Sequence, residues 1–176
     1  PVIGIYLYHT ALFSCLLMLS LMDLDRLRCP KWLAGIMLCV FAGLSIGIPT
    51  LQPVKFYHHL PTDLVSTLPP SMIPIVTCIA GGLIGWLLAS IIQYLSNRKK
   101  TIAASGSAFP LAATLVGIVL GWQAAVTILL FTAVVLAIIC VIKQITKKRF
   151  VVSETFIFSV VAFLHHPLWR WFDGFW

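Results

Sequence analysis

The chain is poor in charge, and above all in acidic residues. Only 10% of its 176 residues are charged, and five acids stand against twelve lysines and arginines. Soluble domains are closer to one-quarter charged. With 60% apolar residues and a mean hydropathy of +1.03, the chain has too few polar groups to cover a water-facing globule. The composition therefore excludes a cytosolic enzyme, a disordered tail and a secreted disulfide scaffold.

Several familiar site patterns are also missing. The five cysteines include no C-x-x-C pair, and four of them lie in apolar runs. We therefore expect small buried side chains from them, with no disulfide framework and no zinc site. The sequence has no Ser–His–Asp spacing, P-loop or dinucleotide fingerprint either. The sequence thus indicates no cofactor.

The five histidines form two adjacent pairs and one single residue: His58–His59, His165–His166 and His9. Imidazole suits zinc, copper and nickel, but neighbouring histidines do not aim at one ion as an i, i+4 helical pair would. We expect interfacial histidines and no metal site.

What the chain does have is long apolar runs. A bilayer's hydrocarbon core takes about 20 residues of helix. Six runs are candidates, at residues 2–22, 32–48, 72–95, 102–120, 122–142 and 150–164, and the fourth has the most polar start. We predict an all-α membrane protein, a bundle of about six transmembrane helices forming one domain over residues 1–176. Because the chain starts at Pro1 rather than Met, we interpret it as a fragment or processed product lacking an N-terminal part.

The basic residues gather on one side of this predicted bundle. All lysines and arginines except Lys55 and Arg170 fall in the loops after the first, third and fifth runs. Cytoplasmic loops of membrane proteins are rich in lysine and arginine. We therefore expect these loops in the cytoplasm, both termini outside, and a multi-pass protein of a bacterial inner membrane. This distribution also accounts for the net charge of +7, so the lipid bilayer and not nucleic acid is the expected partner.

Any acid–base chemistry must come from five acids: Asp23, Asp25, Asp63, Glu154 and Asp173. Asp23 and Asp25 close the first apolar run. Two residues apart on a helix, their side chains diverge by roughly 200°, so they do not form a catalytic pair by themselves. A polar helix end paired with Arg26 and Arg28 is the simpler interpretation of these two acids.

Small residues recur at four-residue spacing in two of the runs. They are Gly81 and Gly85 in the third run, and Ala113, Gly117 and Gly121 in the fourth. This spacing places small side chains on one helical face, which close helix packing requires.

Two segments resemble a known family. Residues 22–33, with Asp23 seven residues before Pro30, resemble the I-D-x-x-x-x-x-I-P-N-x-L stretch of the type IV prepilin peptidases. Residues 111–123, ending in Gly121-Trp122-Gln123, are similar to that family's L-L-A-A-L-G-A-W-L-G-W-Q segment. The resemblance covers most of the chain and includes the basic loop between these segments.

The resemblance implies a GxGD-type aspartic membrane peptidase that cuts basic leaders from prepilins or pseudopilins at the cytoplasmic face. Two aspartates act together in that family, and many members also methylate the new N-terminus. Asp23 falls on the first aspartate, so the resemblance makes it the candidate catalytic residue.

The second motif is degenerate in this chain. Counting back from residues 121–123, the motif G-x-G-D falls on Ser105-Gly106-Ser107-Ala108, and a following lysine falls on Pro110. A later Pro-Phe-Gly-Pro motif is replaced at residues 153–156, and the family's cysteine-rich zinc module is missing. Ala108 therefore occupies the position of the second catalytic aspartate. Glu154, the only acid inside a run, is the one candidate substitute.

We therefore expect a prepilin-peptidase-like membrane protein whose cleavage activity is weak or missing. The alternative is a non-catalytic assembly or scaffold component of a type IV pilus or type II secretion system, with other assembly proteins as partners. A small transporter is a third class, against which stands the lack of paired, broken helices with polar centres.

Overall fold

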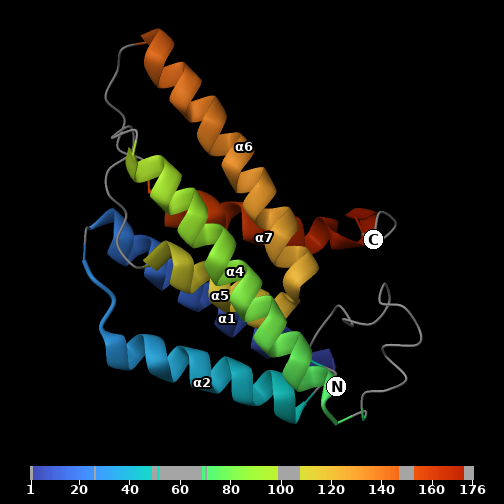
Figure 1. The fold of residues 1–176 in the computed structure, drawn as a ribbon. Helices are drawn as coiled ribbons and strands as arrows, with labels where there is room; N and C mark the ends of the chain where they lie inside the picture. The colour runs from blue at the N-terminus through green and yellow to red at the C-terminus, as the bar shows by residue number, and fades with distance from the viewer. Residues whose placement is uncertain are drawn as a thin grey trace.

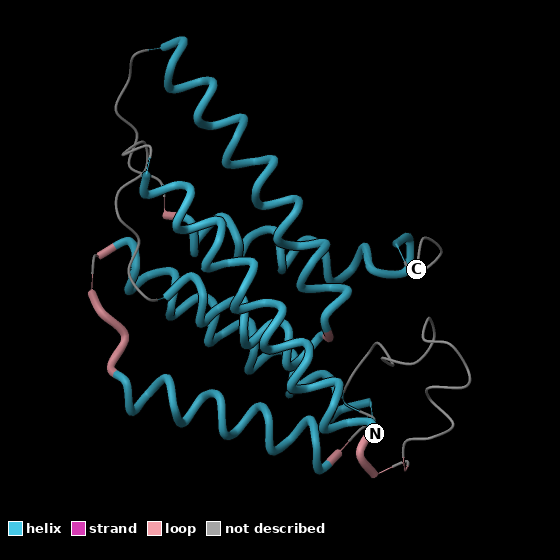
Figure 2. Tube along the Cα trace, in the orientation of Figure 1, coloured by secondary structure: helices cyan, strands magenta, loops and turns pink. Residues whose placement is uncertain are grey.

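Six helices make up the described part of the chain. The structure is a computed structural model, and it describes residues 2–25, 27–48, 51, 69, 71–98, 108–146 and 153–172. The helices are α1 (Val2–Leu24), α2 (Lys31–Gly47), α4 (Ile73–Arg98), α5 (Ala108–Leu120), α6 (Trp122–Thr146) and α7 (Glu154–Phe172). Within these ranges there is no strand, and the described residues outside the helices form turns and loops (Figure 2). The prediction of an all-α bundle is confirmed.

Three of the helices are long and apolar enough to cross a bilayer. They correspond to Ile3–Leu24 in α1, Ile73–Leu95 in α4 and the whole of α6. The other three contain shorter apolar stretches: α2, α5 and the first part of α7. The 13 residues of α5 extend only about 20 Å at 1.5 Å per residue, less than the bilayer core. Long apolar helices make this a membrane protein.

The fourth predicted run is described from Ala108 onwards. Its helix, α5, spans Ala108–Leu120, and residues 102–107 of that run lie outside the described residues. Nearly every residue of α5 is buried, and this helix contacts all five of the others. A helix that is apolar on all sides is expected in the centre of a bundle. This short helix is therefore the core around which the other five pack.

Consecutive helices run in opposite directions (Figure 1). The C-terminal ends of α1, α4 and α6 lie on the same side of the bundle as the N-terminal ends of α2, α5 and α7. The loops predicted to be cytoplasmic connect these ends. The alternation thus agrees with the pattern of basic residues, and we call this side the Asp23 side.

Glycines let α4 and α5 approach each other backbone to backbone. A Cβ atom added to Gly117 would lie 2.0 Å from the carbonyl oxygen of Gly81, and one added to Gly85 would lie 2.3 Å from that of Ala113. Side chains larger than hydrogen have no room at these contacts. Gly81 and Gly85 of α4 therefore face Gly117 and Ala113 of α5 across the interface.

On the side opposite Asp23, hydroxyl groups connect three helices. The Tyr8 hydroxyl in α1 donates to the carbonyl of Phe41 at 3.1 Å and lies 2.5 Å from the Ser45 hydroxyl, both in α2. Ser45 in turn donates to the carbonyl of Ile118 in α5 at 3.3 Å. Buried polar groups in lipid need such internal partners. This network fixes α2 against α1 and α5. It matters most for α2, because this helix packs against the bundle less extensively than the other helices do.

Large apolar side chains cover the outside of the bundle. On α6, Leu130, Val134 and Ile138 are each more than half exposed, and Leu83 and Ile91 on α4 are similar. A soluble protein rarely exposes apolar surface so extensively. Lipid is the solvent that suits this surface.

Candidate functional site: a buried acid between α1 and α7

Asp23 lies in the last turn of α1, where the helix leaves the apolar run. Its side chain is only 9% exposed, whereas Asp25, two residues on, is exposed. This difference agrees with the divergence expected from their spacing. The backbone N–H of Asp25 donates to the Leu21 carbonyl at 3.0 Å, and that of Leu27 to the Met22 carbonyl at 2.7 Å, so the turn is well closed.

The Asp23 carboxylate binds the hydroxyl group of Ser153, the residue directly before α7. The Ser153 Oγ donates a hydrogen bond to Asp23 Oδ2 at 2.5 Å. The Ser153 Oγ also accepts a hydrogen bond from the Phe156 backbone N–H at 3.1 Å, which is the geometry of a helix N-cap. Ser153 therefore caps the N-terminus of α7 and also binds Asp23 at the end of α1.

Glu154 is the first residue of α7 and is only 1% exposed. A carboxylate in the first turn of a helix is favoured by the helix dipole. Because Ser153 touches Asp23 and precedes Glu154 directly, the chain brings both candidate acids to the same end of the α1–α7 interface. Both lie on the Asp23 side, as the predicted topology requires.

The position at which the resemblance predicts a second aspartate, Ala108, carries only a methyl group. Ala108, the first residue of α5, is 2% exposed. Its neighbour Phe109 is fully buried and makes an edge-to-face contact with Phe158 of α7, with ring centroids 5.7 Å apart. The start of α5 is therefore packed with apolar groups. Ser105, Gly106 and Ser107 lie outside the described residues.

A second pair of hydroxyl groups joins the same two helices one turn further into the bundle. The Ser20 Oγ donates to the Leu16 carbonyl at 2.7 Å and lies 2.7 Å from the Ser159 Oγ. Ser159 also donates to the carbonyl of Thr155 at 2.8 Å. The α1–α7 interface is therefore polar at the Asp23 end. Nothing in the sequence pattern pairs these serines, because 139 residues separate them.

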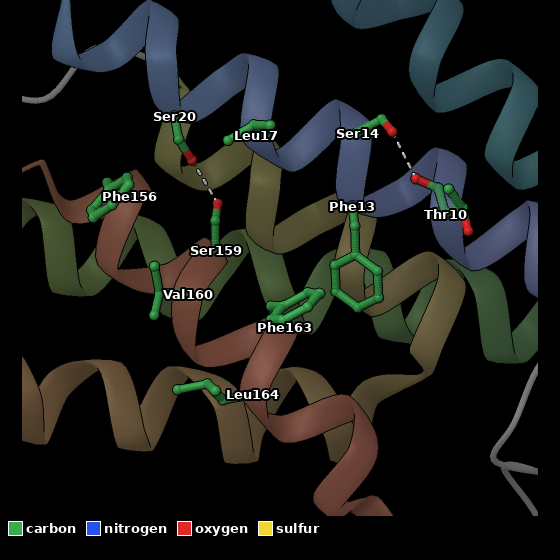
Figure 3. Close-up of a pocket in the computed structure, with 10 residues that line it drawn as sticks. All are labelled: Thr10, Phe13, Ser14, Leu17, Ser20, Phe156, Ser159, Val160, Phe163 and Leu164. Carbon is green, nitrogen blue, oxygen red and sulfur yellow. Dashed lines mark hydrogen bonds between the residues drawn. The ribbon is translucent and has the colours of Figure 1, made fainter.

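A groove continues from this serine pair along the surface between α1 and α7 (Figure 3). It has a volume of about 430 Å³. The groove residues are Thr10, Phe13, Ser14, Leu17 and Ser20 of α1 and Phe156, Ser159, Val160, Phe163 and Leu164 of α7. Phe13 and Phe163 meet edge to face across it, with centroids 5.5 Å apart. The groove is thus a mostly apolar hollow that starts one turn from the buried acid.

Two histidines are buried: His9 in α1 is 7% exposed and His165 in α7 is 4% exposed. The expectation of interfacial histidines stays a prediction. His58 and His59 lie outside the described residues. Among the described residues, no three His, Cys, Asp or Glu side chains are grouped as a metal site would require.

Cys29, in the loop after α1, is 9% exposed. Burial raises the pKa of its thiol, and a backbone hydrogen bond from Ala34 opposes this shift. A thiol with a raised pKa is less nucleophilic at neutral pH. It is therefore not a candidate nucleophile.

Comparison with protein-family models, curated proteins and solved structures finds no match to this chain. The resemblance to the prepilin peptidases therefore depends on the segments around Asp23 and Gly121-Trp122-Gln123 and on the basic loop between them. Chemically, the described site holds one buried carboxylate bound to a hydroxyl. A second buried acid, Glu154, directly follows the residue that carries this hydroxyl.

Proposed function

We propose that this chain is a prepilin-peptidase-like protein of a bacterial inner membrane whose cleavage of prepilin leaders is missing or very weak. The observation that carries the proposal is the pairing at the site: Asp23 binds the Ser153 hydroxyl, while Ala108 presents a buried methyl group at the start of α5. The proposal includes six spans with both termini outside.

The chemical reason is the need for two carboxyl groups. In an aspartic mechanism one carboxyl ionises while its neighbour keeps the shared proton, so that one activates water and the other polarises the carbonyl. A serine hydroxyl does not exchange a proton with Asp23 at neutral pH, and alanine has no proton to give. The pair formed by Asp23 and Ser153 therefore cannot perform this reaction.

The helix arrangement supports the membrane topology of the proposal. Alternating helix directions bring Asp23, Ala108 and Glu154 to one side of the bundle. This is the side to which the basic loops belong, and such loops favour the cytoplasm. A prepilin leader is cut on that same face in the family that this chain resembles.

One observation favours a second candidate, a working peptidase that uses Asp23 and Glu154. Glu154 is almost fully buried and follows the serine that touches Asp23. Acids buried in membrane proteins usually mark function. In this case Glu154 would replace the acid that Ala108 cannot supply.

Without cleavage, the role left to the protein is that of an assembly or scaffold component of a type IV pilus or type II secretion system. Its partners would be assembly proteins of that system. The packed α4–α5 core, with Gly81 against Gly117, would serve such a role without any chemistry at Asp23.

The purified full chain, reconstituted in lipid and incubated with a prepilin that carries a basic leader, tests the proposal. We expect no cleavage by the wild type above the level of the Asp23→Asn variant. Cleavage that is lost in both Asp23→Asn and Glu154→Gln, and kept in Asp25→Asn, would overturn the proposal and establish the second candidate. Asp25 is the matched control because it is exposed in the same turn.

A further inference from the structure

The connection between α1 and α2 exposes cations and large apolar side chains next to one another. It joins the two helices on the Asp23 side (Figure 1). Arg28 and Lys31 are exposed, and the neighbouring Leu27 and Trp32 are 57% and 66% exposed. We call these four side chains the loop surface. They lie outside the chemistry discussed so far.

The loop surface is carried by an ordered turn. The backbone N–H of Leu27 donates to the Met22 carbonyl at 2.7 Å, and that of Ala34 donates to the Pro30 carbonyl at 3.1 Å. Between these two bonds, Cys29 is buried and belongs to the apolar core. The backbone is therefore fixed at both ends and in the middle, so the loop surface has a defined place on the bundle.

The two cations of the loop surface are not neutralised by the acids near them. Within the described ranges, no acid forms an ion pair with Arg28 or Lys31, although Asp25 is exposed in the same loop. Residues 25–31 contain three basic residues and one acid, so this segment is positively charged. Basic residues at a membrane surface attract anionic head groups.

The apolar members of the loop surface indicate which anion is bound. Leu21 on α1 and Ile36 on α2 are each more than half exposed, and in a membrane protein such side chains face hydrocarbon. Leu27 and Trp32 follow where these lipid-facing sides end, and tryptophan is enriched at the boundary between lipid and water. A free anion would leave both apolar side chains in water. An anionic lipid provides a charged head group and hydrocarbon together.

We propose that the loop surface binds anionic phospholipids, with Arg28 and Lys31 at the head-group phosphates and Leu27 and Trp32 in the adjoining acyl region. These lipids stabilise the start of α2, which no side chain caps, whereas the hydroxyl network described above fixes its other end. This contact does not depend on whether the protein cleaves prepilins, so the cleavage assay and the lipid test can fail separately.

Native mass spectrometry of the purified full chain, with equal amounts of dioleoylphosphatidylglycerol and dioleoylphosphatidylcholine, tests the loop surface. The two lipids have the same acyl chains and differ in net charge. We expect the wild type to retain phosphatidylglycerol preferentially. Each basic residue near a membrane surface strengthens the attraction about fivefold, so Arg28→Gln combined with Lys31→Gln should lower this preference about 25-fold. Trp32→Ala should lower the retention of both lipids.

Two controls separate the loop surface from overall charge. Arg28→Lys combined with Lys31→Arg keeps both cations and should keep the preference. Lys55→Gln removes one cation from the loop between α2 and α4 and should change the preference little, whereas Lys31→Gln alone should lower it about fivefold. Thermal unfolding of each variant shows that it is folded, and the single and double substitutions keep the test valid if one variant fails to fold.

Four results would overturn the proposal. They are no preference for phosphatidylglycerol in the wild type, an unchanged preference in the double glutamine variant, equal losses in Lys31→Gln and Lys55→Gln, and displacement of the lipid by an equal concentration of glycerol phosphate. The last result would show a site for free phosphate in place of a lipid surface.

Discussion

Ser153 donates its hydroxyl hydrogen to Asp23 and receives the Phe156 backbone N–H on the same oxygen. Residues 130 positions apart in the chain are thereby joined at the point where α1 ends and α7 begins. The contact gives Asp23 a partner that is not an acid. It also makes the start of α7 depend on the side chain that holds the acid.

Ser153→Ala should therefore destabilise the protein through both bonds. Loss of an N-cap costs about 0.5–2 kcal/mol, and leaving a buried charged acceptor without its donor adds about 1–3 kcal/mol. We expect the free energy of unfolding, measured in mixed micelles, to fall by about 2–4 kcal/mol. Ser14→Ala, which removes an exposed bond to its own helix, should change it little. Equal effects of the two substitutions would contradict the dual role of Ser153.

Two glycine-to-alanine substitutions, one at the α4–α5 contact and one in α2, should change the free energy of unfolding in opposite directions. In Gly117→Ala the new Cβ would lie 2.0 Å from a backbone oxygen, so the helices must separate, at a cost of about 1–3 kcal/mol. In Gly43→Ala the Cβ meets nothing, and alanine in a helix interior is favoured by about 0.5–1 kcal/mol. Thermal unfolding in the same detergent compares the two variants. A Gly117→Ala variant as stable as wild type would show that the backbones do not approach so closely.

Rebuilding the degenerate motif should create activity. The variant Ser105→Gly, Ser107→Gly, Ala108→Asp places a second carboxyl at the start of α5, where the resemblance requires one. We expect prepilin cleavage by this variant, and its loss when Asp23→Asn is added, because the two acids must share a proton. Cleavage that persists without Asp23 would contradict the role given to that residue.

The thiol of Cys29 provides a pH-dependent prediction. Its raised pKa means that less thiolate is present at neutral pH than for an ordinary cysteine. The rate of maleimide labelling should therefore rise with pH and reach half its maximum at a higher pH than that of an exposed thiol. Leu27→Cys in a Cys29→Ser background is the control, because Leu27 is 57% exposed in the same loop. Identical pH profiles would contradict the burial of Cys29.

The helices were predictable from the sequence because each apolar run is long and continuous. In the fourth run the described helix covers Ala108–Leu120, and the polar start with Ser105 and Ser107 lies outside the described residues. The spacing of Gly81, Gly85 and Gly117 predicted a close-packing face but could not say which helix it meets. That partner depends on the tertiary arrangement of α4 and α5.

The site was predictable only in part. Motif spacing predicted Asp23 and Ala108 as site positions, and the rarity of acids predicted Glu154. The hydrogen bond from Ser153 has no local signal, since serine is common and its partner is distant in sequence. The burial of His9 and His165 likewise depends on the tertiary packing of α1 and α7 in the bundle, which hydropathy alone does not specify.

The central claim is that Asp23 lies on the cytoplasmic side of a bundle whose helices alternate in direction. Single cysteines at Leu27→Cys and Ser71→Cys, in an otherwise cysteine-free chain, measure this most directly, because both positions are exposed and lie at opposite ends of the bundle. A membrane-impermeant maleimide applied to intact cells should label the cysteine at position 71 and reach the one at position 27 only after permeabilisation. Labelling of position 27 in intact cells, with position 71 protected, would contradict the topology and the proposed function with it.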